Sequence, residues 1–408
     1  MSTAMIQRKP RYYTSGASYL TEGLPKIRRM AHVAQAFTPS APIDRWELFR
    51  GRTGQVQDVV SAVSQRGQHV ALYGERGVGK TSLANVLEEI FRADDLPSFH
   101  AAKVNCGTED TFESVWRNVF RELALEPPKD DPSPEDVRYL LSGLERPVLI
   151  IIDELDRLED NASLTLLADT IKSLSDHIVP STLVLVGVGR SIDDLIGEHA
   201  SVERALVQVE MPRMSEGELR EILENGFGRV GLKVATSAVR RIVSLSAGLP
   251  HYTHLLGNTA GQTAVANDRD QVTVGDVDEA IAQAVEKHSI RSEYQKATRS
   301  PRPDNLFPHV LLACALAKKD QLGFFPAGAV RDPLEVIARR RLEIPAFARH
   351  LAEFLEPGRG PALQREGVPR RYFYRFANPL LQPYVILNGL SAGLTTYDQV
   401  VLLRSGGL

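Results

Sequence analysis

The chain has 408 residues, enough for two or three domains, and its 43% hydrophobic and 24% charged residues are ordinary for a globular protein. Its net charge of -3 gives no global field toward nucleic acid or an anionic membrane, so any such surface must be local. No apolar stretch reaches membrane-spanning length and no signal-peptide core opens the chain, so we expect a cytoplasmic protein without membrane contact. Cys106 and Cys314 lie far apart in apolar surroundings, which predicts buried thiols.

Residues 1–35 form a basic N-terminal segment. Six basic residues face one acid, a net of +5, and three tyrosines lie among them. No clear period runs through the segment, so we expect a mobile extension. A basic, aromatic arm could alternatively contact nucleic acid or a neighbouring subunit.

Residues 36–211 alternate strand-like runs with helical patterns, which predicts an α/β domain with a parallel sheet. We expect strands at 69–73, 101–105, 147–152, 182–188 and 206–210. Helices are expected at 54–65, 80–92, 111–124, 161–176 and 191–198. The proline-rich stretch 127–134 is predicted to be a surface loop.

Residues 74–81 read G-E-R-G-V-G-K-T, a complete phosphate-binding loop between an apolar strand and a helix. Its glycines let successive N–H groups turn toward a polyphosphate, and the helix presents its positive end to the same anion. Lys80 would reach the β/γ-phosphates and Thr81 would bind Mg²⁺. A glycine-rich turn that binds nothing is the alternative, and both flanks disfavour it. The nucleotide-binding residues expected here are Gly74, Glu75, Arg76, Gly77, Val78, Gly79, Lys80, Thr81 and Ser82.

The second half of the expected site is an apolar strand that ends in Asp153 and Glu154. Such a strand is buried in a parallel sheet, and ligands bind at the edge where its acids emerge. Asp153 would hold Mg²⁺ through water, and Glu154 would orient the attacking water. This pair indicates hydrolysis rather than transfer to a small molecule.

These residues resemble AAA+ ATPases, and within them the branch shared by origin-recognition-like initiators and STAND signalling NTPases. The resemblance covers roughly residues 37–390. It implies a P-loop parallel sheet followed by an all-α lid and a winged-helix domain, with ATP and Mg²⁺ as cofactors.

The resemblance also assigns residues outside the phosphate loop. Residues 48–52 resemble the family's motif around the adenine, which places Arg50, Gly51 and Arg52 at the nucleotide. The strand ending at 188 would be followed by a γ-phosphate sensor, Arg190 or Ser191. Arg204 stands where the family places an arginine finger that reaches a neighbour's ATP. A solvated surface arginine is the alternative.

Residues 212–290 are predicted to form the helical lid, with helices at 215–229, 236–246, 251–266 and 275–288. The sequence G-L-P at 248–250 resembles the family's G-x-P element, which assigns Pro250 and His251 to the nucleotide. The following helix lacks the arginine that initiators commonly carry there, and this favours slow, switch-like hydrolysis. A partly buried histidine with a structural role is the alternative for His251.

The C-terminal part is expected to comprise a linker at 291–305, a winged-helix domain at 306–395 and a tail at 396–408. Its helices are expected at 306–318, 330–341 and 345–356, and its β pieces at 362–365 and 371–376 around a turn at 366–369. Ten arginines face six acids between residues 331 and 375, a net of +4. On the predicted wing, Arg365, Arg370 and Arg371 would contact DNA phosphates. A winged helix that serves packing or partner binding is the alternative.

Two functions are compatible with these residues. In the first, ATP bridges subunits into a homo-oligomer on duplex DNA, which recruits or regulates a partner enzyme. In the second, the chain is a STAND-type switch, for example in defence against foreign DNA, whose ATP-driven assembly activates a separate effector protein.

Overall fold

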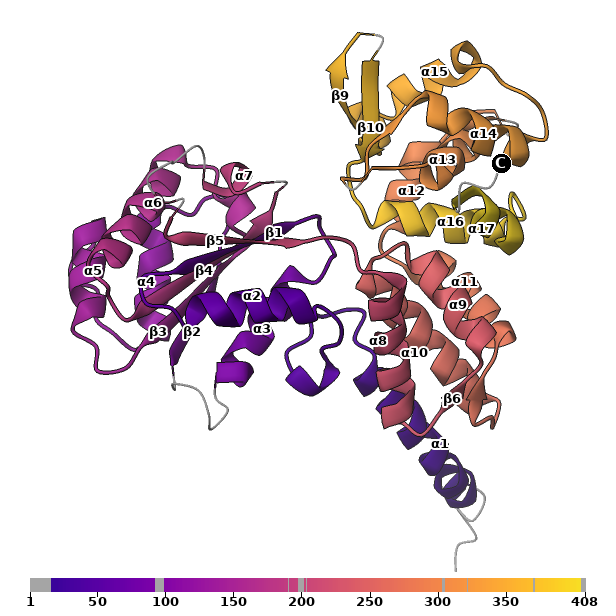
Figure 1. The fold of residues 1–408 in the computed structure, drawn as a ribbon. Coiled ribbons are helices and arrows are strands. Elements are labelled where there is room, and N and C mark those ends of the chain that lie inside the picture. The colour runs from indigo at the N-terminus through magenta and orange to yellow at the C-terminus, as the bar shows by residue number, and fades with distance from the viewer. Residues whose placement is uncertain are drawn as a thin grey trace, which may run out of the picture.

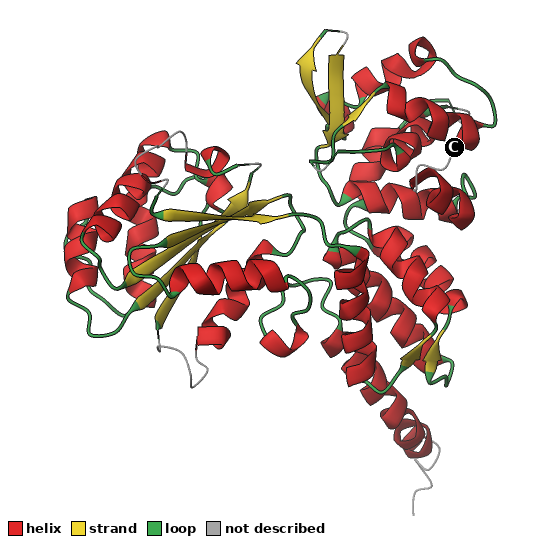
Figure 2. Cartoon of the chain, viewed as in Figure 1, coloured by secondary structure: helices red, strands yellow, loops and turns green. Residues whose placement is uncertain are grey.

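The computed structural model describes residues 16–91, 99–189, 191–196, 202, 204–302, 305–320, 322–369 and 371–404. A sheet domain lies at the left of Figure 1, and the helical lid and C-terminal module are stacked at the right. Helices dominate both right-hand parts (Figure 2). Arg190 and Arg370, two of the predicted site residues, lie outside the described residues.

Five parallel strands form the sheet in the order β2-β3-β4-β1-β5. The strands are β1 His69–Gly74, β2 His100–Asn105, β3 Val148–Asp153, β4 Ser181–Val188 and β5 Leu206–Met211. All five predicted strands are confirmed to within one residue at either end. Because the strands are parallel, the carboxyl ends of β1, β3 and β4 meet at one edge.

Helices cover both faces of this sheet. α2 Thr53–Val63 and α3 Lys80–Phe91 pack on one face, and α4 Phe112–Glu122, α5 Pro134–Ser142, α6 Asn161–Asp176 and α7 Asp193–Ile196 pack on the other. The prediction missed α5, whose first residue falls in the expected loop 127–134. A capping box between Ser133 and Asp136, with Pro134 in the first turn, starts the helix there.

The lid comprises α8 Glu216–Arg229, α9 Thr236–Ser246, α10 Pro250–Ala266 and α11 Val274–Lys287. These four helices were predicted. A short parallel pair, β6 Lys233–Val234 and β7 Gln271–Val272, was not predicted.

The helix α1 Gly16–Ala36 contacts α8 and α10 of the lid, and Val33 and Ala36 near its C-terminal end are buried, so the prediction of a mobile extension is wrong for that end of the helix. Phe37, which follows the helix, lies against two glycines, Gly226 of α8 and Gly257 of α10, and Val33 lies against a third, Gly261 of α10. A Cβ at Gly257 would lie 2.8 Å from Phe37 Cε1, and one at Gly261 would lie 2.8 Å from Val33 Cγ1. Gly226 makes the same kind of close contact. Only glycine lets α1 approach this closely.

The C-terminal module runs helix, strand, helix, helix, strand, strand, and then two more helices. After α12 Arg291–Thr298 come α13 Phe307–Leu316, β8 Phe325–Pro326, α14 Gly328–Ala338, α15 Ile344–Glu353, β9 Leu363–Val368, β10 Arg371–Phe376, α16 Leu381–Ser391 and α17 Tyr397–Arg404. The three strands form an antiparallel sheet in the order β8-β10-β9.

Three expectations for this part differ from the structure. The expected linker contains α12, which Arg359 fixes by donating to the carbonyls of Ala297 and Arg299 at 2.8 and 2.9 Å. The expected tail contains α17, which buries Val400 and Leu403. The expected turn at 366–369 is mostly strand, because β9 continues to Val368 in register with β10.

Both cysteines are buried and free, as expected. Among the helices that the structure describes, none is long and apolar enough to cross a membrane.

Candidate nucleotide site

A cavity of about 760 Å³ lies between the sheet domain and the lid. The phosphate loop, the carboxyl ends of β3 and β4, and the first turn of α10 line it. Segment 38–43 and the apolar residues Leu48, Phe49 and Ile222 also line it. Leu380, just before α16, contributes from the C-terminal module. The lining therefore combines the backbone and polar side chains of the phosphate loop with apolar side chains.

The phosphate loop has the backbone that its glycines permit. Gly77 and Gly79 adopt φ angles of 87° and 100°, in the left-handed region where a Cβ is strained. Lys80 is 8% exposed, and its Nζ donates to the carbonyls of Gly74 at 3.0 Å and Glu75 at 2.9 Å. Burial lowers the pKa of Lys80 to about 8, while Asp156 and Asp153 oppose that shift. The ammonium is thus held inside the curve of the loop.

Asp153 lies beside the loop and is 3% exposed. Its Oδ1 accepts from Thr81 Oγ1 at 3.4 Å and from the backbone N–H of Glu154 at 2.9 Å. Its Oδ2 lies 3.2 Å from Nζ of Lys103, on β2. A hydroxyl and a carboxylate side by side are the oxygen ligands that Mg²⁺ prefers. These residues fit the expected Mg²⁺ site.

Glu154 also lines the cavity, in a left-handed backbone conformation with φ of 56°. Its side chain is half exposed, and Oε2 accepts from Arg157 at 2.9 Å. Sequence reasoning did not identify Arg157 or Asp156, which also line the cavity. Asp156 Oδ1 accepts from the N–H of Val188 at 2.8 Å, which joins the loop after β3 to the end of β4.

Residues 63–196 match the sequence profile of the AAA domain. This part of the chain, which includes the phosphate loop and the end of β3, is therefore similar to an AAA domain. No curated protein matches the chain in sequence.

The chain is also similar to solved structures of origin-recognition proteins. Aeropyrum pernix ORC2, solved as ADPNP–ADP complexes, is 17% identical with a TM-score of 0.50, over 91% of this chain and 98% of that one. Pyrobaculum aerophilum Cdc6p is 14% identical with a TM-score of 0.47, over 89% and 99%. Aeropyrum pernix ORC1 in complex with DNA is 17% identical with a TM-score of 0.48, over 86% and 98%. The similarity to ORC2 is therefore one of fold.

The residues of the predicted adenine motif, Arg50 to Arg52, bond mainly to other protein groups around the cavity. Arg52 is 2% exposed, and its Nη2 donates to the carbonyl of Val78 at 2.9 Å. Burial lowers the pKa of this guanidinium. Arg50 lines the cavity but donates to Phe49 O at 2.6 Å and Asn225 Oδ1 at 2.9 Å. The N–H of Gly51 donates to Glu221 of the lid at 3.2 Å.

Pro250 and His251 of the lid, which were predicted to lie at the nucleotide, line the cavity. His251 Nε2 lies 2.9 Å from His288 Nε2, so one ring nitrogen has a protein partner. Burial lowers the pKa of His251. His254, which was not predicted, also lines the cavity. Sequence reasoning missed it because its position in α10 resembles an ordinary buried histidine.

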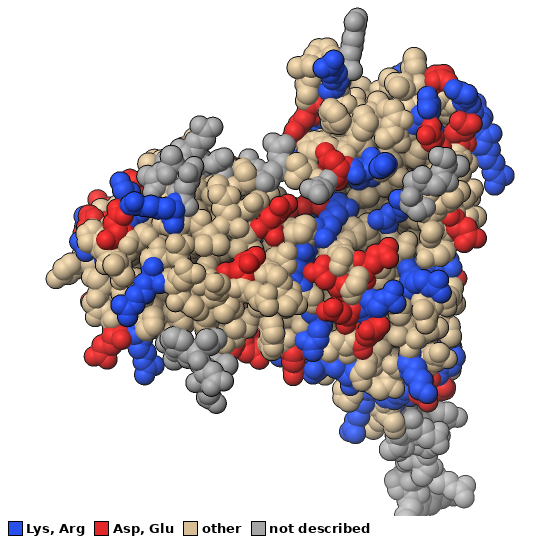
Figure 3. Space-filling model, viewed as in Figure 1, with Lys and Arg blue, Asp and Glu red and all other residues tan. Residues whose placement is uncertain are grey.

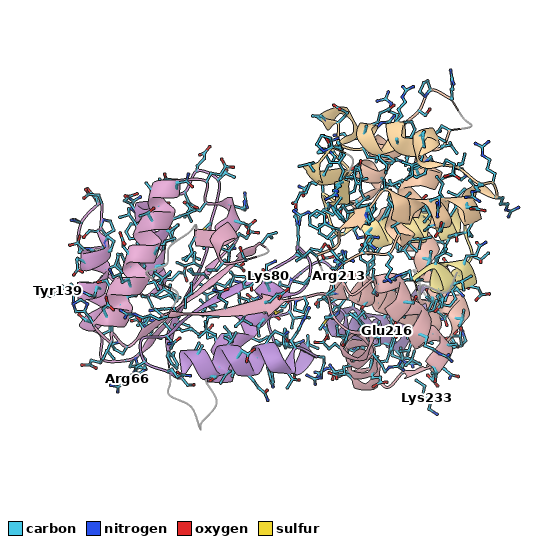
Figure 4. The ribbon with its side chains drawn as sticks, turned by 45° about the horizontal axis from the view of Figure 1, so that its top comes forward. Arg66, Lys80, Tyr139, Arg213, Glu216 and Lys233 are labelled. Carbon is cyan, nitrogen blue, oxygen red and sulfur yellow. The ribbon has the colours of Figure 1, made fainter. Side chains whose placement is uncertain are left out.

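Arg213, which was not predicted, lies at the start of the lid and links the phosphate loop to the C-terminal module. Arg213 donates to Glu75 Oε2 at 2.6 Å and Oε1 at 2.9 Å, and to Gln382 Oε1 of α16 at 2.8 Å. In Figure 4, Arg213 and Lys80 lie at the junction between the sheet domain and the other parts. Leu380 lies against the phosphate loop, where a Cβ at Gly77 would be 2.9 Å from Leu380 Cδ2.

The remaining predicted residues lie away from the cavity. Arg204, 79% exposed, pairs with Asp176 at 3.0 Å and lies at the start of β5, the sheet edge opposite the phosphate loop. Among the described residues, the cavity lining does not include Ser191. Arg365 and Arg371 are exposed on β9 and β10. On the face drawn in Figure 3, basic and acidic side chains are interspersed over the lid and C-terminal module.

Proposed function

We propose that the protein binds ATP with Mg²⁺, hydrolyses it slowly, and transmits its nucleotide state to the C-terminal module. The observation that carries this proposal is the single cavity onto which Lys80, Asp153 and Glu154 converge, with Leu380 of the C-terminal module at its wall. ORC2, which shares the fold, was solved with ADPNP and ADP.

The residues divide the work as follows. The amides of the phosphate loop and Lys80 bind the polyphosphate, and the apolar side chains of the lining contact the base. Thr81 directly, and Asp153 through water, would hold Mg²⁺, which neutralises charge on the phosphoryl oxygens. Glu154 orients the attacking water and accepts its proton. Because Glu154 is paired with Arg157, that pair must open first, which is consistent with slow turnover.

Two variants test this assignment. Lys80→Ala removes the buried ammonium and should abolish binding of ATP. Glu154→Gln should bind ATP as tightly as wild type but lose hydrolysis by roughly 100-fold or more, because the proton acceptor is gone. Calorimetry and phosphate release provide the two readouts. Equal hydrolysis by wild type and Glu154→Gln would contradict the role of Glu154.

Assembly of a homo-oligomer through ATP is part of the proposal. Arg204 is exposed and lies at the sheet edge opposite its own phosphate loop, so it can serve only a neighbour's nucleotide. Each variant alone should lack ATP hydrolysis. In a mixture, the intact phosphate loop of an Arg204→Ala subunit can face the intact Arg204 of a Lys80→Ala subunit. Mixing the two variants should therefore restore part of the hydrolysis. Arg66→Ala, another exposed arginine, is the matched control. No recovery in any mixture would refute the finger role.

Binding of duplex DNA by the C-terminal module is also proposed. Its element order is that of a winged helix, with β9 and β10 as the wing. Arg331, Arg341, Arg349 and Arg359 are each paired with an acid of the same module. Arg365 and Arg371 lie on the predicted wing and have no such ion pair among the described residues, so we propose them as phosphate contacts.

The DNA test is salt-dependent binding of a duplex in the presence of ATP. Arg365→Ala with Arg371→Ala should weaken binding, and the slope of log affinity against log salt should fall by about two, one per lost contact. Arg341→Ala, whose partner is Glu343, should have a smaller effect. Absence of binding at low salt would refute the DNA role.

A STAND-type switch with a separate effector is the second candidate. The packing of Leu380 on the phosphate loop and the link from Glu75 through Arg213 to Gln382 favour it, because the module rests on the nucleotide site. Light scattering with ADP and with a non-hydrolysable ATP analogue should show a larger assembly with the analogue, and a partner pull-down would then identify the effector. A monomer in every nucleotide state would rule out this function.

A further inference from the structure

Lys103 of β2 lies beside the carboxylate of Asp153. In the register of the two parallel strands, Asn105 pairs with Asp153. Side chains two residues apart on a strand share a face, so Lys103 lies on the same face of the sheet as Asp153. Its Nζ lies 3.2 Å from Asp153 Oδ2 and donates to Asn85 Oδ1 of α3. The ammonium therefore contacts one carboxylate oxygen, while the hydroxyl of Thr81 contacts the other.

The amide of Asn85 fixes the place of this ammonium. Asn85 Nδ2 donates to the carbonyl of Ile43 at 3.1 Å, so the amide turns its oxygen toward Lys103. An ammonium has only donors, and two of those of Lys103 point at oxygens of the protein. The Lys103 side chain is 30% exposed, whereas Asp153 is buried. The positive charge of Lys103 is thus held on a carboxylate that water scarcely reaches.

This ion pair matters to any anion that enters the phosphate loop. The other cation near Asp153 is Lys80, which donates to the carbonyls of Gly74 and Glu75. Among the described residues, the ion pair of Asp153 is with Lys103. A buried carboxylate without a cation would repel a polyphosphate a few ångström away, because the protein screens charges less than water does. Lys103 reduces that repulsion.

We propose that Lys103 offsets the charge of Asp153 and so lets ATP bind to the phosphate loop in the absence of Mg²⁺. Lys103 is a positioning residue, because it acts on the nucleotide through Asp153. The inference rests on the proposed binding of ATP and deepens it, since it assigns the residue that sets how far this binding depends on the metal. In the presence of Mg²⁺ the ion supplies positive charge at the same carboxylate, so the contribution of Lys103 is largest without the metal.

The first test measures the affinity for a non-hydrolysable ATP analogue in excess Mg²⁺ and in EDTA, by calorimetry on the full chain. Lys103→Gln removes the charge and keeps a hydrogen-bond donor. It should weaken binding in EDTA about tenfold, while binding in Mg²⁺ changes by less than about twofold. Lys103→Arg keeps the charge and should retain the wild-type ratio of the two affinities. Lys172→Gln, at an exposed lysine of α6, is the control.

The second test measures the metal itself. Mn²⁺, which accepts the same oxygen ligands as Mg²⁺, is titrated into the complex of protein and analogue and followed by electron paramagnetic resonance. By linkage, a tenfold loss of metal-free affinity with unchanged affinity in the metal requires Mn²⁺ to bind this complex about tenfold more tightly in Lys103→Gln. A variant that is merely damaged would bind both the analogue and the metal more weakly.

The outcomes separate the role of Lys103 from the proposed function. An equal loss of affinity with and without the metal in Lys103→Gln would overturn the proposal, and so would a wild type that binds the analogue only with Mg²⁺. If wild type binds the analogue under both conditions and the ratio is unchanged in Lys103→Gln, only the role of Lys103 is refuted. If wild type binds the analogue under neither condition, the proposed ATP function itself is refuted.

Discussion

Replacing Arg213 by methionine tests whether the phosphate loop and the C-terminal module are energetically coupled. The guanidinium donates twice to Glu75, once to the carbonyl of Ala247 and once to Gln382. The side chains of Arg213 and Glu75 are 23% and 27% exposed, so water screens the pair only in part. Arg213→Met keeps the aliphatic stem and removes every one of these bonds.

The magnitude follows from this geometry. Hydrogen bonds to charged groups contribute roughly 1.5–3 kcal/mol each, and the loss here leaves a half-shielded carboxylate behind. We expect Arg213→Met to lower the free energy of unfolding by about 3 kcal/mol. Because Glu75 and Arg213 are in contact, a double-mutant cycle with Glu75→Gln should give a coupling energy of about 1–2 kcal/mol.

The assay is urea unfolding of wild type, the two single variants and the double variant, followed by circular dichroism. A control cycle uses Lys26 and Asp268, a pair whose side chains are 35% and 82% exposed, and should be additive. If the losses of Glu75→Gln and Arg213→Met add to within about 0.5 kcal/mol, the coupling between loop and module is refuted.

The remaining predictions concern the loop and a buried histidine. Gly77→Ala places a Cβ on a residue in the left-handed region and 2.9 Å from Leu380 Cδ2. Calorimetry should therefore show the affinity for ATP reduced at least about tenfold. The control variant Gly54→Ala, which has open space around the added Cβ, should bind ATP as wild type does. Burial lowers the pKa of His69 to about 4, so the unfolded chain binds more protons below pH 6.5 and stability falls from there toward pH 4. His69→Asn should reduce this pH dependence in urea titrations by up to about 1.4 kcal/mol per pH unit, and an unchanged slope would contradict the assignment.

The sheet domain was predictable because its signals are local. Each strand is a continuous apolar run, and the phosphate loop follows its strand directly. The position of α1 was not predictable in this way, since it depends on Gly226, Gly257 and Gly261 in helices some 200 residues later in the chain. Glycines four residues apart inside α10 were the available signal, and they indicate that another chain segment approaches closely.

The candidate site shows the same division. Lys80, Thr81, Asp153 and Glu154 were found because their spacing from a strand end is fixed. The Arg213 bridge depends on how three parts of the chain pack together. The sequence around a single arginine after a strand does not indicate which carboxylate or amide its side chain contacts in the fold.

Segment 38–43 connects the lid to the sheet domain. Phe37, just before it, packs against Gly226 and Gly257 of the lid, and Ile43 hydrogen-bonds to Ser82 and Asn85 of α3 in the sheet domain. Six residues span at most about 20 Å when fully extended. A movement of the lid that separates Phe37 and Ile43 by more than this distance must first break the packing of Phe37 on the lid glycines. The length of the segment thus limits how far the lid can move from the sheet domain. Deleting one residue from the segment should therefore slow nucleotide exchange.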